Sequence, residues 1–336
     1  MSGTYSPGSK LPFQAELAQS FQVSGLTIQQ AMHRLAREGF VVARRRIGTV
    51  VVSKLPHLHN LAFILPQDPL NTDFFSRFFT VLSNAARYLQ DKQDRPIRVF
   101  HNINRHSDVE DRQQLLDLIN AHQLAGIIFA MHPYLLEGTP ILEQAGIPRV
   151  AIMNCQKYSQ VPAIAYDMQS FIRRALDHLR SRGRRRIAVL APPGTDLLDA
   201  RFEAELVKRG IRCPPHWQQL ILQSGAVGAC NCVRLLLQGS AATRPDGLII
   251  ADDNLVEHAL AGLIAEQIRV PTDLEVVVHC NFPWPPTEVM PVTRLGFDSR
   301  EVLRQCIDLI DQQRRGETVR GVTHVAPVFE GELSAV

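Results

Sequence analysis

The chain has 336 residues, of which 45% are hydrophobic and 21% are charged. This length predicts two or three domains, and the apolar fraction is sufficient for a sizeable core. The sequence has no apolar run near the roughly 18 residues of a membrane span, and its first residues lack the basic and apolar segments of a signal peptide. We therefore expect a cytoplasmic protein without membrane contact.

The net charge of +3 is unevenly distributed along the chain. Residues 1–54 contain seven Lys or Arg and two acidic residues, so this segment carries +5 and the remainder carries −2. A small basic segment on a near-neutral body indicates that the segment meets a polyanion.

The six cysteines are scattered, and only Cys230 and Cys232 are close together. One intervening residue does not match the CxxC spacing of a structural zinc site, and no second pair matches it. We expect reduced thiols, no metal site and no cofactor.

Residues 11–39 show the pattern of two short helices that meet at a turn. Ser24 is suited to cap the second helix, and Gly39 is suited to end it. One face of that helix is apolar and should be buried: Ile28, Ala31, Met32 and Leu35. The opposite face is polar and contains Thr27, Gln29, Gln30, His33, Arg34 and Arg37.

A hairpin with a basic tip follows in "FVVARRRIGTVVV", residues 40–52. Two helices, a turn and a basic hairpin are the layout of a winged helix-turn-helix domain. We expect the second helix to enter the DNA major groove and the arginines of the hairpin to lie against phosphates or in the minor groove. A helical subdomain with a solvated basic loop is the alternative.

The same residues resemble the DNA-binding domain of GntR-type bacterial regulators. The matching motifs are Tyr-x-Pro-Gly-x-x-Leu-Pro, Glu-Leu-Ala, Val-Ser-x-x-Thr, Ala-x-x-x-Leu-x-x-x-Gly and the Gly-Thr of the wing. Pattern and resemblance together predict double-stranded DNA as a partner, contacted by Ser24, Gly25, Thr27, Gln29, Gln30, Arg34, Arg44, Arg45, Arg46 and Gly48.

The head also departs from this family. The family usually has arginines where Gly25 and Gln29 stand here, so we expect a different target sequence. Its domain begins with another helix before the Tyr-x-Pro-Gly motif. Either that helix is absent or the true start lies upstream, and we favour the second interpretation.

After a linker at residues 55–60, apolar strand-like runs alternate with amphipathic helical stretches up to residue 330. Such alternation indicates parallel sheets that are covered on both faces. A restart near residue 162 predicts two lobes, the first at about 61–161 and 292–315, and the second at about 162–280 with the C-terminal strands. The predicted fold class is a small α+β winged helix-turn-helix domain, residues 1–54, followed by a two-lobed α/β doubly wound domain.

In doubly wound folds ligands bind beyond the carboxyl ends of the strands, which here means the cleft between the lobes. Ordinary loop polarity or helix capping is an equal alternative for each candidate in this cleft. The candidates are polar or aromatic residues near predicted strand ends: Gln67, Asp68, Asn71, Asp73, Phe74, His132, Asn154, Asp252, Asp253, Cys280, Asn281 and Trp284.

The body resembles the core of LacI-type regulators, which is periplasmic-binding-protein-like, over nearly all of residues 60–330. Segments that carry the resemblance include "AGIIF", "RPDGLIIADDNLVEHAL" and "PVTRLGFDSREVLRQCIDLI". It implies a hinge near 160–166, 280–292 and 316–323, pairing through both lobes, and a sugar as the default effector. Leu198 and Cys280 replace two usual ligand anchors, so another ligand, weak binding or an empty cleft stay open.

No catalytic pattern is present: the sequence lacks a Gly-rich phosphate loop, a G-x-S-x-G elbow and H-E-x-x-H. The basic run "RSRGRRR", residues 180–186, favours a solvated loop over a second nucleic-acid contact. We expect a non-enzymatic, ligand-responsive transcriptional regulator, a repressor that binds a palindromic operator as a homodimer. The alternative is a ligand-binding or structural module that has lost effective DNA binding.

Overall fold

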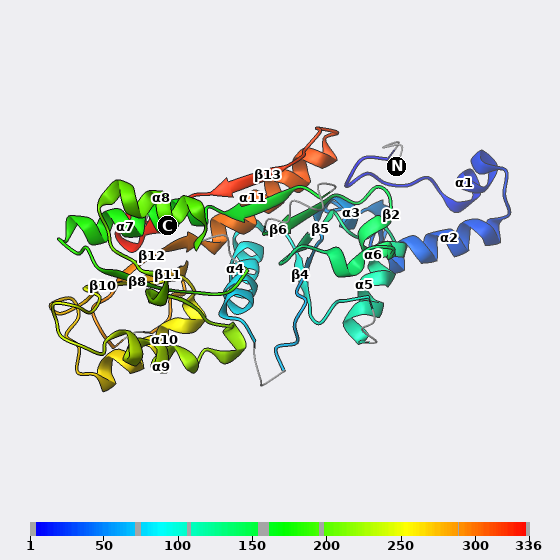
Figure 1. Ribbon diagram of the computed structural model, residues 1–336. Coiled ribbons are helices and arrows are strands. Elements are labelled where there is room, and N and C mark those ends of the chain that lie inside the picture. Colours follow the sequence, from blue (N-terminus) through cyan, green and yellow to red (C-terminus); the bar gives the residue numbers. More distant parts are fainter. Residues whose placement is uncertain are drawn as a thin grey trace.

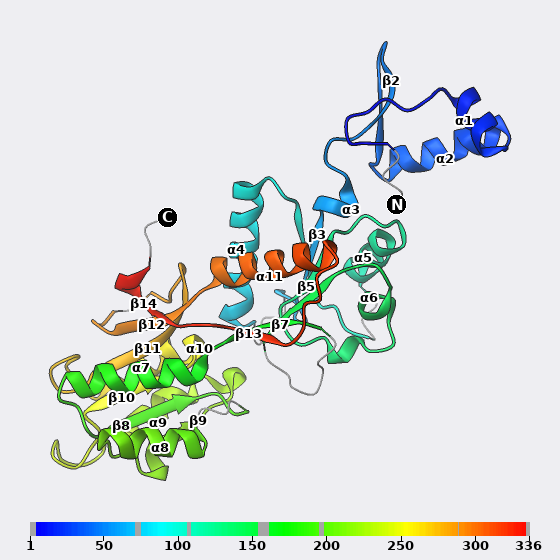
Figure 2. The same cartoon turned by 90° about the horizontal axis from the view of Figure 1, so that it is seen from above.

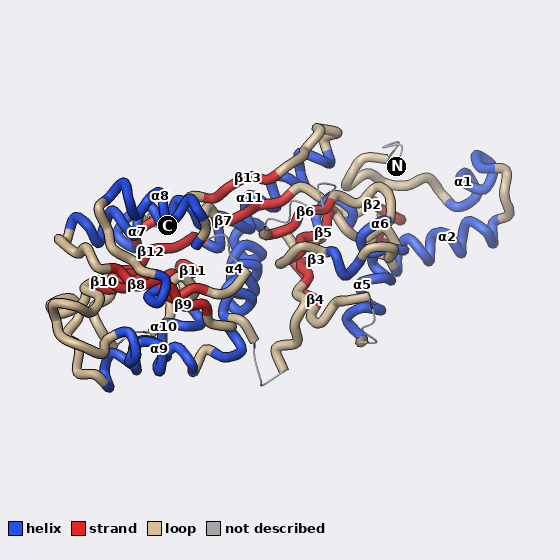
Figure 3. The backbone as a smooth tube through the Cα atoms, in the orientation of Figure 1, coloured by secondary structure: helices blue, strands red, loops and turns tan. Residues whose placement is uncertain are grey.

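The computed structural model describes residues 5–70, 75–105, 109–153, 161–194, 198–287 and 289–333. It has a small head, residues 5–54, and a body of two lobes that each contain a six-stranded sheet. Figures 1 and 3 show the head at one end of an elongated molecule, beside the first lobe, with the second lobe at the other end. The predicted fold class is confirmed. Four predicted effector residues lie outside the described residues: Asn71, Asp73, Phe74 and Asn154.

Two helices and an antiparallel hairpin form the head. Ser24 caps the second helix as predicted, because its hydroxyl accepts from the amide of Thr27 at 3.1 Å. Residues 8–11 run along the second strand, where the amide of Leu11 donates to the carbonyl of Thr49 at 2.9 Å. The elements are α1 (Gln14–Phe21), α2 (Gly25–Arg37), β1 (Val41–Arg44) and β2 (Gly48–Val51).

The core cluster of the head is small. It consists of four buried residues, with half-buried side chains packed against it. On the predicted buried face of α2, Ile28 is buried and Met32 and Leu35 are half-buried, but Ala31 is exposed. The prediction is therefore wrong at Ala31, because the described part of the head leaves that turn of the helix uncovered. The four core residues are Leu11, Phe40, Val41 and Val51.

The sheet of the first lobe has the strand order β13-β7-β6-β5-β3-β4, and all neighbouring strands are parallel. Its strands are β3 (Leu61–Ile64), β4 (Ile97–Phe100), β5 (Gly126–Phe129), β6 (Arg149–Ile152), β7 (Ala163–Tyr166) and β13 (Val322–Val325). Its helical elements are α4 (Arg77–Gln93), α5 (Glu110–Asn120), η1 (Tyr134–Leu136) and α6 (Pro140–Glu143). The later helix α11 (Ser299–Arg314) packs against α4 and β6 of this lobe.

The sheet of the second lobe has the order β14-β12-β11-β10-β8-β9, and β14 alone among its described strands pairs antiparallel. Its strands are β8 (Ile187–Ala191), β9 (Gln218–Leu220), β10 (Gly247–Ile250), β11 (Glu275–Phe282), β12 (Thr293–Asp298) and β14 (Val328–Phe329). Its helical elements are α7 (Met168–Ser181), α8 (Ala200–Arg209), η3 (Pro215–Trp217), η4 (Gln223–Gly225), α9 (Gly228–Leu236), α10 (Asp253–Ala265) and η5 (Glu330–Glu332).

The division of the chain between the lobes differs from the expected one. β7 and β13 complete the first sheet, although residues 162–280 and the C-terminal strands were assigned to the second lobe. β12 pairs with β11 in the second sheet, although 292–315 was assigned to the first. The chain therefore crosses between lobes after Tyr166, Asp298 and Val325, so the crossing expected near 280–292 lies later in the chain. Apolar pattern predicts a strand but not its partner, which explains the difference.

One buried cluster joins the two lobes. Successive residues of β3 point to opposite faces of the first sheet, so that Leu61 and Phe63 join one cluster and Ala62 and Ile64 another. The cluster that contains Leu61 and Phe63 also includes buried residues of the second lobe, among them Phe297. The lobes are thus packed on each other as well as linked by the three crossings.

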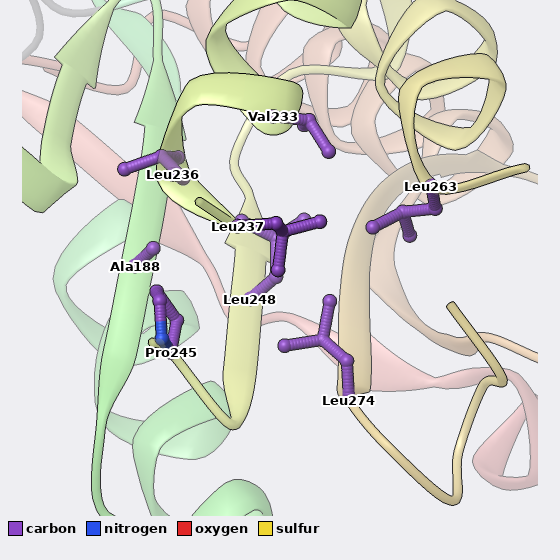
Figure 4. Close-up of a pocket in the computed structure, with 8 residues that line it drawn as sticks. All are labelled: Ala188, Val233, Leu236, Leu237, Pro245, Leu248, Leu263 and Leu274. Atoms are coloured by element: carbon purple, nitrogen blue, oxygen red, sulfur yellow. The ribbon is translucent and has the colours of Figure 1, made fainter. Parts of the chain in front are cut away.

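A small apolar cavity lies inside the second lobe, and Figure 4 shows the side chains that line it. All are apolar: Ala188, Val233, Leu236, Leu237, Pro245, Leu248, Leu263 and Leu274. Because it offers no polar group to orient a ligand, this cavity is a packing defect rather than a candidate effector site. Within the described ranges, no helix is both long and apolar enough to span a bilayer.

Candidate DNA-contact surface and inter-lobe cluster

The outer face of α2 presents the side chains predicted to meet DNA. Leu26 is 64% exposed, and Gln29 and Gln30 are exposed beside it. Arg34 is held at the other end of the helix, where its Nε lies 2.8 Å from Oε1 of Glu38. An open groove runs along this face, lined by Leu26, Gln29, Gln30, His33, Arg34 and Arg37.

The start of α2 is open to close approach. The hydroxyls of Ser24 and Thr27 lie 2.8 Å apart and form the cap. A Cβ built on Gly25 would have no neighbour within 4 Å, so its backbone faces open space. The first amides of a helix also favour negative charge, such as a phosphate group.

The tip of the hairpin places three exposed arginines side by side. The amide of Ile47 donates to the carbonyl of Arg44 at 3.1 Å and closes the turn. Arg46 has a φ of +66° and Gly48 a φ of +108°, both in the left-handed region. Arg44, Arg45 and Arg46 are all exposed. Clustered exposed cations create the positive potential that attracts a phosphate backbone.

The segment between head and body, predicted as a linker, contains the short helix α3 (Pro56–His59). The ring of His57 lies 5.6 Å from that of Phe40 in the head. On the other side, Arg314 of α11 donates to the carbonyl of His57, and Nε of Arg95 donates to the carbonyl of His59 at 3.1 Å. Burial, followed by the charge of Arg314, lowers the pKa of His57 below its ordinary value. α3 is therefore held by both the head and the first lobe.

A second contact ties α2 directly to the first lobe. Nε2 of Gln123, which follows α5, donates to the carbonyl of Glu38 at 2.6 Å. Glu38 is the C-cap of α2, so this bond satisfies a carbonyl that the helix itself leaves unpaired. A movement of the first lobe would therefore act on the end of α2.

Between the lobes, two helix N-termini meet. The side chain of Asn254, on α10, accepts from the amide of Arg77 at the start of α4 at 3.0 Å. The same side chain donates to Oδ1 of Asp252, the N-cap of α10, at 2.7 Å. Gln67 accepts from the amide of Ser76 at 3.2 Å, and Gln223 donates to Asp252. The bond between Asn254 and Arg77 connects the second lobe to the first, and the other bonds hold its two partners in place.

A buried group of polar residues lies next to this contact. Nδ2 of Asn281 donates to Oδ2 of Asp253 at 2.8 Å, and the hydroxyl of Tyr166 donates to Oδ1 of Asn281 at 3.3 Å. Burial, which is the largest cause, raises the pKa of Asp253. Burial also raises the pKa of Tyr166 and lowers that of His279, so each group is held toward its neutral form.

Tyr166 also connects the lobes through its ring. It stacks on Phe297 of β12 with ring centroids 4.2 Å apart. Ser299, the first residue of α11, is buried next to it. The residues that share these contacts are called the inter-lobe cluster below: Gln67, Ser76, Arg77, Tyr166, Asp252, Asp253, Asn254 and Asn281.

The structure brings together only some of the predicted effector residues. Gln67, Asp252, Asp253 and Asn281 belong to the inter-lobe cluster. Asp68 instead accepts from the amide of Leu70 at 2.8 Å and closes a turn.

The other described candidates lie in different surroundings. His132 stacks on Tyr134 with centroids 6.3 Å apart. Cys280 does not follow its strand: β11 extends to Phe282, so the Cys280 side chain is fully buried in the core. Trp284 is half-buried and packs against the main core cluster.

Four residues of the inter-lobe cluster were not predicted: Ser76, Arg77, Tyr166 and Asn254. Asn254 directly follows the predicted Asp252 and Asp253, and Tyr166 ends the apolar run "AIAY", so strand-end position was a usable signal for both. Ser76 and Arg77 begin a helix of the other lobe, and only the folded contact identifies them.

The basic run at residues 180–186 is anchored to its surroundings. Nη2 of Arg186 lies 3.3 Å from a carboxylate oxygen of Asp246, and Arg184 donates to the carbonyls of Pro271 and Thr272. These bonds hold the loop ahead of β8 in place. The other arginines of the run, Arg180, Arg182 and Arg185, are exposed, which favours the expected solvated loop.

Comparison with known families gives two matches. Residues 1–51 match the family described as bacterial regulatory proteins, gntR family. Residues 176–330 match the periplasmic binding protein-like domain. Both matches agree with the motifs of the head and of the body.

Two curated relatives align with nearly the whole chain. An arabinose metabolism transcriptional repressor of Geobacillus stearothermophilus is 23% identical over 95% of this chain and 91% of its own length. A repressor with the same description from Halalkalibacterium halodurans is 23% identical over 99% of this chain and 91% of its own length.

Solved structures with a similar fold cover about four fifths of the chain. A LacI-family regulatory protein from Chloroflexus aggregans superposes with a TM-score of 0.62 at 18% identity, covering 82% of this chain and 97% of that one. A LacI-family transcriptional regulator from an Arthrobacter species, in complex with lactose, gives 0.60 at 18% identity, covering 81% and 97%. At 18% sequence identity this structural similarity supports the fold alone.

Proposed function

We propose that this chain, which joins a gntR-type head to a periplasmic-binding-protein-like body, is a ligand-responsive transcriptional repressor. The proposal rests on a physical connection from the head through the first lobe to the second lobe. A DNA-contact face on α2 is bonded at its end to the first lobe, and that lobe is bonded to the second through polar groups. A ligand between the lobes would thus act on the part that meets DNA.

Charge and exposure of the head support DNA binding. The wing arginines and the open start of α2 suit phosphate contacts, which give affinity without sequence preference. The glutamines of α2 suit base contacts, which give sequence preference. Binding should weaken steeply with salt, because each neutralised phosphate releases counterions.

The chemistry of the inter-lobe cluster supports a small polar effector. Asp252, Asn254 and Gln67 offer amide and carboxylate groups that suit hydroxyls, and the two relatives described above are arabinose metabolism transcriptional repressors by name. We therefore propose a sugar, with L-arabinose as the first to test. An effector that binds one arrangement of the lobes more tightly shifts the population toward it.

The remaining parts of the proposal are cytoplasmic location and a homodimer. A two-fold dimer presents two recognition helices to two half-sites, which matches a palindromic operator. Light scattering after size exclusion, with and without operator DNA, tests the dimer.

Footprinting on the region upstream of the chain's own gene tests the function. We expect two protected half-sites at low salt, loss of protection as salt rises, and release by L-arabinose or another sugar of a panel. Protection that is absent at low salt would leave the alternative, a module that no longer binds DNA effectively.

Two variants separate the parts of the mechanism. Arg45→Ala should weaken binding to all sequences alike, because it removes a phosphate contact. Asn254→Ala should leave operator affinity intact and reduce release by the sugar, because it removes a bond between the lobes. If the two variants changed operator affinity and release by the sugar to the same extent, the separate roles of Arg45 and Asn254 would be contradicted.

A further inference from the structure

The first half of α2 carries no charged side chain, and this bears on which bases the head reads. Leu26, Gln29 and Gln30 are exposed there. The basic residues of this helix, Arg34 and Arg37, lie in its last turn. Arg34 is further drawn to Glu38 by the 2.8 Å ion pair. A helix that enters the major groove contacts base edges mainly with its N-terminal residues.

The three side chains lie on one face. Leu26 precedes Gln29 by three residues and Gln30 by four, which is the spacing of neighbours on a helix surface. All three line the open groove along α2. Leu26 gains little from the head itself, since 64% of it is exposed. The face therefore combines one apolar side chain with two amides.

This combination matches one base pair in particular. In the major groove an adenine offers one acceptor and one donor, which a glutamine amide pairs with at two points. A thymine presents a C5-methyl group, which takes apolar contact. Guanine offers two acceptors and is matched by Arg or Lys, which this half of the helix lacks.

We propose that α2 reads A·T base pairs at the centre of each half-site, with Gln29 and Gln30 on adenine edges and Leu26 against a thymine methyl. The proposal rests on the proposed function and names the partner sequence of that same surface. Gly25 contributes by leaving the helix start without a side chain, so that the backbone can approach the groove closely.

Selection from a random double-stranded DNA library identifies the half-site bound by the full chain. We expect A·T pairs at its centre. Thymidine is then replaced by deoxyuridine at one position at a time, which removes only the methyl group. We expect about a fourfold loss of affinity at one central position, from the burial of one methyl group. This loss should disappear in Leu26→Ala.

Two further variants test the amides. Gln30→Ala should relax discrimination at one adenine by about tenfold. Gln29→Arg should raise the preference for guanine at one position by a similar factor. Leu235→Ala is the matched control, since Leu235 is also 64% exposed but lies on α9 of the second lobe. It should leave both affinity and the effect of uracil unchanged.

The outcomes separate this inference from the proposed function. A selected half-site with central G·C pairs, or one in which uracil has no effect, would overturn the inference while DNA binding stands. The same holds if Leu26→Ala keeps the effect of uracil. Failure to bind any library member at low salt would overturn the proposed function and the inference with it. Circular dichroism of each variant checks that the head remains folded.

Discussion

Four residues form the core cluster of the head, whereas one cluster of the body runs through both lobes. The head exposes Leu26 and Phe21 at more than 60%, while the central strands of the body are completely buried. The head is also attached by contacts to α3 and Gln123. A small domain with few buried side chains has little stability in reserve. The stability of the head therefore depends more on contacts with its neighbours than the stability of the body does.

The largest expected effect comes from truncating one phenylalanine in each part. Phe40→Ala and Phe63→Ala should each cost about 3–5 kcal/mol. In the head this exceeds the local stability, so α2 should unfold and operator binding should be lost. In the body the substitution should lower the melting temperature by about 10 °C, and operator binding measured at 25 °C should be unchanged.

Calorimetry and hydrogen exchange of the α2 amides measure the two effects. Phe13→Ala is the control in the head, because Phe13 is 64% exposed. If Phe40→Ala left the exchange of α2 unchanged, the head would be more stable by itself than its core suggests.

Asp253→Asn should stabilise the body. Burial raises the pKa of Asp253 in the folded chain, so the ionised form is disfavoured there. The contribution of Asp253 to stability is therefore fully present below the ordinary pKa of 3.8. It is lost as pH rises through the raised pKa. The amide variant, which can still accept from Asn281, should have a free energy of unfolding about 1–2 kcal/mol higher at pH 7 and should melt at a higher temperature.

Thermal melts of both proteins between pH 4 and pH 8 test this expectation. The difference between them should shrink toward acid pH. A difference that grew toward acid pH would mean that Asp253 is stabilised as a carboxylate.

Gln123→Ala should loosen the head from the body without unfolding either. The lost bond to the carbonyl of Glu38 is worth about 1 kcal/mol, or about fivefold in the population of detached heads. Tryptic cleavage after Lys54, between head and body, should rise by that factor. Gln113→Ala is the control, because Gln113 bonds only within α5, to Asp117 at 2.9 Å. Equal cleavage of both variants would show that the bond to Glu38 does not hold the head.

The smallest expected effect is the titration of His57. Its pKa is lowered in the folded chain, so folding favours the neutral ring. The contribution of His57 to stability is fully present above the ordinary pKa of 6.5. It is lost as pH falls from there through the lowered pKa. The contact between head and α3 should therefore weaken slightly in mild acid.

His57→Phe keeps a ring against Phe40 and removes the titration. Cleavage after Lys54, measured by a protease active from pH 5 to pH 8, should become less dependent on pH in this variant. His59 lies on the same helix, and burial followed by the charge of Arg95 lowers its pKa as well, so His59→Gln is measured beside it. An unchanged pH dependence in His57→Phe would assign the effect to another group.

Local signals in the sequence were sufficient for much of the fold. Ser24, the α2 pattern and the basic hairpin predicted the head, because caps and periodicity act over a few residues. The assignment of β12 and β13 to lobes failed, because it depends on pairing between distant strands. Cys280 was misplaced for a related reason: β11 is longer than its apolar run and includes polar residues.

The site was less predictable than the fold. Asp252, Asp253 and Asn281 were candidates because they lie at or near strand ends, where doubly wound folds bind ligands, and the structure places them in the inter-lobe cluster. Ser76 and Arg77 were not found, since their part in the cluster comes from Asn254 of the other lobe. The register of one lobe on the other is a property of packing that no short segment encodes.

The helix α11 reaches from the inter-lobe cluster to the segment between head and body. It begins at Ser299, beside Tyr166 of the inter-lobe cluster, and ends at Arg314, which bonds α3 beneath the head. Figure 2 shows it running between the two regions. Its 16 residues make a rod about 24 Å long. As a lever pivoted at the cluster, a tilt of about 10° would carry its far end by about 4 Å, on the scale of the distance between adjacent base pairs.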